Sequence, residues 1–191
     1  FQLQNSSPSV YTRGFNQWFV MLLPIAVSFP TISLFCDEHI YQYDFFILNR
    51  IGLRRYVRKS FWAALGCGML LVVSALLLYA LVIGTQFPLR ADFGNIQIVG
   101  REEDILGAEL WSAVVITFSY VLWAGAVTGV AYLFASIGNN IYVNVTMPFL
   151  FNYILFNYVE QNVLMWAALT ILLTYGVSAQ IWKYKGRMYG A

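Results

Sequence analysis

The chain has 191 residues, of which 60% are hydrophobic, 18% are aromatic and only 10% are charged. A soluble domain has about 25% charged residues, and a chain of this length would need more polar side chains to cover its surface. The net charge of +2 is too small for the basic surface of a nucleic-acid-binding protein. The composition therefore excludes an ordinary soluble enzyme, a disordered region and a nucleic-acid binder, and it indicates a multi-pass membrane protein.

Five apolar segments follow one another along the chain, each close to the ~20 residues that a helix needs to cross a bilayer. They occupy about residues 17–36, 61–84, 110–137, 141–159 and 163–182. The alternating pattern of a transmembrane strand is absent from them, so each segment predicts a helix. The predicted fold is an all-α transmembrane bundle that forms a single domain over residues 1–191.

The basic residues predict how the segments are oriented. Five of the eleven Lys and Arg residues lie in the loop over residues 37–60, and three follow the last segment. Cytoplasmic loops are enriched in Lys and Arg, so we expect this loop and the C-terminus on the cytoplasmic side of the plasma membrane, and the 85–109 loop outside. This orientation places Phe1 on the external side, and an external N-terminal segment requires a preceding span. We therefore also expect a further helix before Phe1 and six spans in total.

The apolar segments contain no Asp, Glu, Lys, Arg or His. An ion- or proton-coupled carrier normally has an ionisable residue within its spans, so this class is disfavoured. His39 is the only histidine, and no H-E-x-x-H motif is present. We therefore expect no metal site and no enzymatic activity in this chain.

Asparagines and prolines within the segments suggest either a transport pathway or helix packing. Asn152 and Asn157 in the fourth segment each need a polar partner in lipid, and they either line a pathway or join helices. Pro24 and Pro30 are expected to kink the first segment or to mark an irregular stretch. These residues are the candidate pathway lining.

Gly125 and Gly129 form a G-x-x-x-G motif in the third segment. Small residues at this spacing allow two helices to approach closely. The motif predicts helix packing, either within the chain or against a second copy, and packing within the chain is favoured.

The loop over residues 37–60 has the sequence DEHIYQYDFFILNRIGLRRYVRKS. Its aromatic first half predicts a short amphipathic helix at the membrane surface, and its basic second half would contact anionic headgroups. An aromatic, charged loop of this kind can also be no more than an interfacial anchor.

This loop resembles the first cytoplasmic loop in the permease subunits of ABC transporters of the type-2 exporter class. Glu38 matches the acid that opens the loop in that family. The turn is matched by Leu48, Asn49 and Arg50, and the entry to the next helix by Arg54, Arg55, Tyr56 and Lys59. The glycine that usually follows the acid is replaced here by Tyr41, Gln42 and Tyr43.

The resemblance implies six spans and an ATPase-coupling loop at residues 38–50, which would dock on a separate ATPase subunit. The implied coupling residues are Glu38, His39, Tyr41, Gln42, Asp44, Phe45, Leu48, Asn49 and Arg50. The implied partners are two ATPase subunits, which would bind ATP and Mg²⁺, and a second permease that is the same or a related chain. No G-x-x-x-x-G-K-[ST] phosphate loop occurs in the sequence, so no cofactor is expected here.

The resemblance therefore implies that the chain forms half of an export pathway. The scarcity of charge in the apolar segments favours a hydrophobic or amphiphilic cargo, such as a lipid-like molecule or an antimicrobial-type peptide. The alternative is a membrane scaffold without transport activity, or a sensor subunit of a membrane complex. The two differ in the partner that they require, since only an exporter needs an ATPase.

Overall fold

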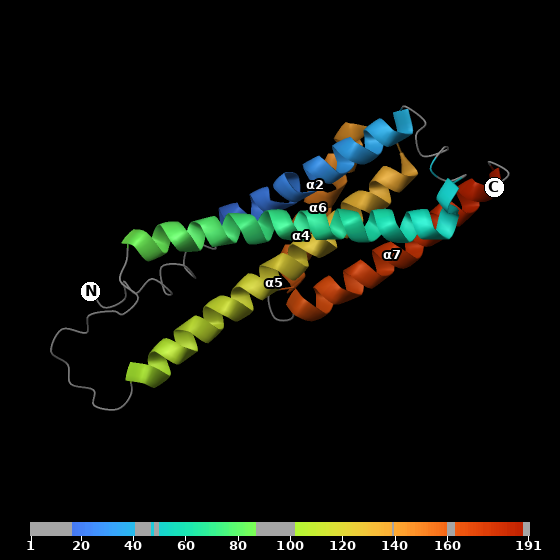
Figure 1. The fold of residues 1–191 in the computed structure, drawn as a ribbon. Coiled ribbons are helices and arrows are strands. Elements are labelled where there is room, and N and C mark those ends of the chain that lie inside the picture. The colour runs from blue at the N-terminus through green and yellow to red at the C-terminus, as the bar shows by residue number, and fades with distance from the viewer. Residues whose placement is uncertain are drawn as a thin grey trace.

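The computed structural model describes the backbone of residues 17–40, 47, 50–86, 102–138, 140–159 and 163–188. Across these ranges the chain forms five helices and no strand, which confirms the all-helical class (Figure 1). The helices are α2 (Gln17–Ile40), α4 (Leu53–Gln86), α5 (Glu102–Ile137), α6 (Ile141–Val159) and α7 (Val163–Met188). Each contains one of the five apolar segments of the sequence.

Two helices begin well before their apolar segments. The apolar run of α4 starts at Phe61, but the helix itself starts at Leu53, so its first two turns carry the basic cluster. Arg and Lys are good helix formers, and the backbone hydrogen bonds of a helix do not stop at the membrane surface. Gly52, with a φ of 81°, provides the turn before α4, and its carbonyl accepts a 3.1 Å hydrogen bond from the Tyr56 backbone N–H. In the same way, α5 begins at Glu102 rather than at residue 110.

The outer surface of the bundle is apolar. Leu70, Leu77 and Leu81 of α4 are 69%, 60% and 66% exposed, and Leu172 of α7 is 71% exposed. Such a surface is unfavourable in water but matches the hydrocarbon of a bilayer. In the described part of the chain three stretches are long and apolar enough to cross a membrane, namely Leu53–Gln86, Leu110–Ile137 and Val163–Lys185. Shorter apolar stretches occupy α2 and α6.

Helix α5 is the central element of the bundle. It packs against all four of the other helices, and α2 also contacts α4 and α6, while α4 also contacts α7. Every residue of α5 from Trp123 to Tyr132 is buried. The first half of α5 runs away from the other helices (Figure 1), and Trp111 and Phe118 are exposed there.

Glycines bring the helices around α5 into close contact. A Cβ atom added at Gly68 of α4 would collide with Thr128 of α5 and would lie 2.9 Å from Val27 of α2. A Cβ at Gly125 would overlap Met69 of α4, and one at Gly129 would lie 2.7 Å from the Thr174 hydroxyl of α7. The structure thus places both glycines of the G-x-x-x-G motif against helices of the same chain.

The interior contains many small and polar side chains. Thr170, Thr174 and Ser178 are buried along one face of α7, and the Thr174 hydroxyl donates a 2.8 Å hydrogen bond to the Thr170 carbonyl. Because lipid is as apolar as Leu, helices in a membrane associate through close packing of small residues and hydrogen bonds. The inward face of α7 is therefore its more polar face.

Candidate functional site at the basic end of α4 and α7

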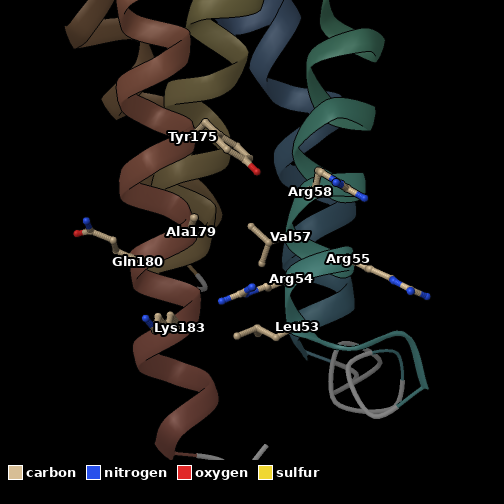
Figure 2. A pocket seen from close by; sticks show the side chains of 9 residues that line it. All are labelled: Leu53, Arg54, Arg55, Val57, Arg58, Tyr175, Ala179, Gln180 and Lys183. Atoms are coloured by element: carbon tan, nitrogen blue, oxygen red, sulfur yellow. The ribbon is translucent and has the colours of Figure 1, made fainter.

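A groove of about 600 Å³ lies between the N-terminal turns of α4 and the C-terminal turns of α7. Its lining combines basic, aromatic and aliphatic side chains: Leu53, Arg54, Arg55, Val57, Arg58, Tyr175, Ala179, Gln180 and Lys183. The two helices run antiparallel, so the start of one lies beside the end of the other (Figures 1 and 2). This arrangement combines the basic cluster of α4 with the basic end of α7.

The side chains of the groove point in different directions (Figure 2). Arg54 extends from α4 into the space between the helices, where Leu53, Val57 and Ala179 form an aliphatic surface. The Tyr175 hydroxyl points from α7 toward α4, whereas the Arg55 and Arg58 side chains extend away from α7. The three arginines and Lys183 are exposed, so they can move to contact a bound group.

An aromatic contact beside the groove joins α4 to α7. Tyr56, Val57 and Trp182 form a buried cluster, and the rings of Tyr56 and Trp182 meet edge to face with centroids 5.4 Å apart. The Trp182 Nε1 donates a 3.1 Å hydrogen bond to the Ser136 hydroxyl of α5. Trp182 therefore connects three helices at one point.

A second aromatic contact lies one turn further into the bundle. Phe61 of α4 packs against Tyr132 of α5 and Tyr175 of α7, with ring centroids 5.4 and 5.1 Å apart. The hydroxyls of Ser60 and Tyr132 share a 2.7 Å hydrogen bond. Each aromatic pair stabilises the contact by about 0.5–1.5 kcal/mol beyond its buried area. The basic end is therefore the part of the bundle where α4, α5 and α7 are held together by directional contacts.

The groove lies at the level where the apolar segments of both helices end. On α4 the cations Arg58 and Lys59 directly precede the apolar run from Phe61, and on α7 Lys183 directly follows Trp182. The Lys185 ammonium lies 5.6 Å from the centre of the Trp182 ring. Trp, Tyr, Lys and Arg side chains gather in this way at the membrane–water boundary.

The predicted coupling loop is described only at its two ends. Glu38 and His39 belong to the last turn of α2, but their side chains lie outside the described residues, as do Tyr41, Gln42, Asp44, Phe45, Leu48 and Asn49 in full. Arg50 is exposed just before Gly52. Ile47 is half-buried and packs against the Tyr56, Val57 and Trp182 cluster. Residue Ile47 of the predicted loop thus contacts the buried cluster beside the groove.

The candidate pathway residues whose side chains are described lie outside the lining of this groove. Asn152 is buried between α5 and α6, and its Oδ1 accepts a 2.6 Å hydrogen bond from the Trp123 indole. Asn157 belongs to α6, but its side chain lies outside the described residues. Pro24 is buried and Pro30 half-buried within α2, and the Ser28 hydroxyl donates to the Pro24 carbonyl.

Sequence reasoning identified the basic cluster of α4 but did not pair it with Gln180 and Lys183 of α7. The charges before one apolar segment and after another suggest a common membrane face, but they do not show which helices are neighbours. Close packing of α5 with both helices decides the pairing. No signal in a single sequence reports that contact.

Comparison of the chain with known protein families, with curated proteins and with solved structures finds no match. Within the described residues, no three His, Cys, Asp or Glu side chains lie together where they could hold a metal ion. The function must therefore be argued from the residues of the basic end and their geometry.

Proposed function

We propose that this chain is the membrane-spanning permease subunit of an ATP-driven exporter that works with separate ATPase subunits. The observation that carries the proposal is the contact of Ile47 with the Tyr56, Val57 and Trp182 cluster. Through it, the 38–50 segment packs against a cluster that joins α4 to α7. The resemblance of this loop to the coupling loop of type-2 exporter permeases supports the same function.

The contacts at the basic end suggest how movement would pass into the membrane. Residues 38–50 would dock on an ATPase subunit, and closure of two ATPase subunits around ATP and Mg²⁺ would displace the loop. Ile47 would pass this displacement to Trp182, and the Trp182–Ser136 hydrogen bond would extend it to α5. Because packed helices move as rigid bodies between discrete arrangements, the displacement would open the far end of the pathway.

The pathway itself would lie between two permeases, this chain and a second copy or a related chain. In this proposal the protein has six spans, and its loop and C-terminus are cytoplasmic. Asn157, Pro24 and Pro30 remain the candidate lining of the pathway, whereas Asn152 is held in the contact with Trp123. The scarcity of charge within the spans favours a hydrophobic or amphiphilic cargo, because a charged cargo would require compensating charges in the bilayer.

The first experiment is purification of the full chain in mild detergent with identification of its bound partners. We expect an ATPase that carries a phosphate-loop motif. A soluble enzyme in its place would favour the alternative, a scaffold or sensor subunit. Transport that persists after ATP depletion would contradict the proposal and favour a secondary carrier.

The second experiment tests the coupling loop. The Glu38→Arg/Leu48→Arg double variant should lose cargo-stimulated ATP hydrolysis, since it alters the docking surface. Ile47→Ala should still bind the ATPase but couple poorly, because the step from loop to helix is lost. The matched control is Thr85→Arg/Gln86→Arg, which adds two exposed arginines at the opposite end of α4 and should couple normally. Normal coupling in both loop variants would disprove the role of this loop.

A further inference from the structure

The groove between α4 and α7 collects positive charge without a described counterion. Arg54, Arg55, Arg58 and Lys183 all contribute to its lining, and none of the described residues that line it is acidic. The first turn of α4 contains no acid, although the N-terminus of a helix is the positive end of its dipole. Like charges this close repel one another, so the groove favours an anion.

The walls of the groove indicate that this anion is amphiphilic. Leu53, Val57 and Ala179 present aliphatic carbon to the space that Arg54 enters (Figure 2). A soluble phosphate gains nothing from such a wall, whereas the glycerol and first acyl carbons of a lipid bury apolar area against it. The groove also lies at the level where the apolar segments end, which is where lipid phosphates are concentrated.

We infer that this groove binds the phosphate of an anionic phospholipid from the surrounding bilayer. Arg54 is the principal ligand, because its guanidinium can donate two parallel hydrogen bonds to phosphate oxygens. Lys183 adds a positive charge from the opposite helix, and the Tyr175 hydroxyl, which points toward α4, is the neutral donor. Basic pockets between membrane helices are common sites for anionic headgroups.

A lipid in this position would bridge α4 and α7 beside the Tyr56–Trp182 contact. A ligand that binds only the folded bundle stabilises it, and the stabilisation grows with the logarithm of the ligand concentration above its Kd. This inference requires only that the chain lies in a membrane with the groove at the bilayer surface. It does not depend on an ATPase partner. Lipid binding can therefore be absent while the proposed function holds, and it can be present while the proposed function fails.

The test uses the purified full chain in nanodiscs of phosphatidylcholine alone or of equal parts phosphatidylcholine and phosphatidylglycerol. We expect the anionic lipid to raise the Tm of the wild-type chain and to remain bound in native mass spectrometry. Arg54→Gln should weaken phosphatidylglycerol binding by at least about tenfold, the effect of losing a hydrogen bond between two charged groups. The matched control is Lys59→Gln, which removes an exposed cation from the same end of α4 but outside the groove lining, and it should bind like the wild type.

Two further measurements test whether the groove itself binds the lipid and whether free phosphate can replace it. Ala179→Leu narrows the groove without changing any charge, so it should also weaken lipid binding, and it keeps the test valid if Arg54→Gln folds poorly. Inorganic phosphate added to phosphatidylcholine nanodiscs should leave the Tm unchanged. The inference is overturned if inorganic phosphate stabilises the chain as well as the anionic lipid does. It is also overturned if Arg54→Gln and Lys59→Gln weaken binding equally, or if phosphatidylglycerol has no effect on the wild type.

Discussion

The Trp123 indole of α5 donates a 2.6 Å hydrogen bond to the Asn152 side-chain oxygen of α6, and both side chains are buried. In the interior of a membrane bundle neither group can turn to water for a partner. The two residues therefore hold α6 against the central helix. From the sequence alone, Asn152 is equally suited to a pathway and to helix packing, and here it forms an interhelical contact.

A double-mutant cycle should measure this contact. Asn152→Leu and Trp123→Phe each remove one partner, and the coupling free energy between them should be about 0.6–1.7 kcal/mol, the range for hydrogen bonds between membrane helices. The measurement is the free energy of unfolding in mixed detergent micelles. Additive effects of the two substitutions would show that the hydrogen bond does not stabilise the α5–α6 pair.

Gly68→Ala should destabilise the bundle, whereas Gly66→Ala, two residues earlier on α4, should not. The added methyl at Gly68 overlaps Thr128 and crowds Val27, and overpacking of this kind costs about 1–3 kcal/mol. A Cβ at Gly66 has no neighbour within 4 Å, so that variant should be as stable as the wild type or slightly more stable. Thermal unfolding of the two purified variants compares them directly. Equal losses of stability would mean that the three helices do not meet at Gly68.

Substitutions of Trp182 should separate its two contacts. Trp182→Phe keeps a ring beside Tyr56 but loses the hydrogen bond to Ser136, at a cost of about 1 kcal/mol. Trp182→Ala loses both contacts and leaves a cavity, at a cost of about 3–5 kcal/mol. Urea or detergent unfolding of both variants provides the comparison. If Trp182→Phe proved as damaging as Trp182→Ala, the hydrogen bond rather than the packing would dominate.

Cysteine labelling should report the membrane position of α4. In a Cys36→Ser background, Cys67 is exposed on the apolar part of α4, and a charged maleimide should not label it in intact membranes because the charged reagent does not enter the hydrocarbon. With Cys67 also changed to Ser, Lys59→Cys and Lys183→Cys should react from one side of the membrane and Thr85→Cys from the other. Denatured protein, in which all sites react, is the control. Labelling of Lys59→Cys and Thr85→Cys from the same side would contradict a spanning α4.

The existence and order of the helices follow from the sequence, since a stretch of apolar residues in lipid must satisfy its backbone hydrogen bonds internally. Helix ends were predicted less well, because the basic turns before Phe61 and the turns before Leu110 are also helical. For the candidate site, the sequence identified the arginines of α4 and the lysines that follow the last apolar segment. It could not show that Arg54 and Lys183 line one groove.

Sequence by itself determined the membrane class, the helical segments and the concentration of basic residues in the 37–60 loop and the C-terminal tail. Only the tertiary structure decided which face of each helix is inside, because both faces are apolar and lipid gives no reason to bury the more apolar one. Gly68, Gly129 and Thr174 face inward because close helix contact and hydrogen bonds select small and polar residues there. The same contacts place α4 beside α7, and so create the groove that neither helix contains alone.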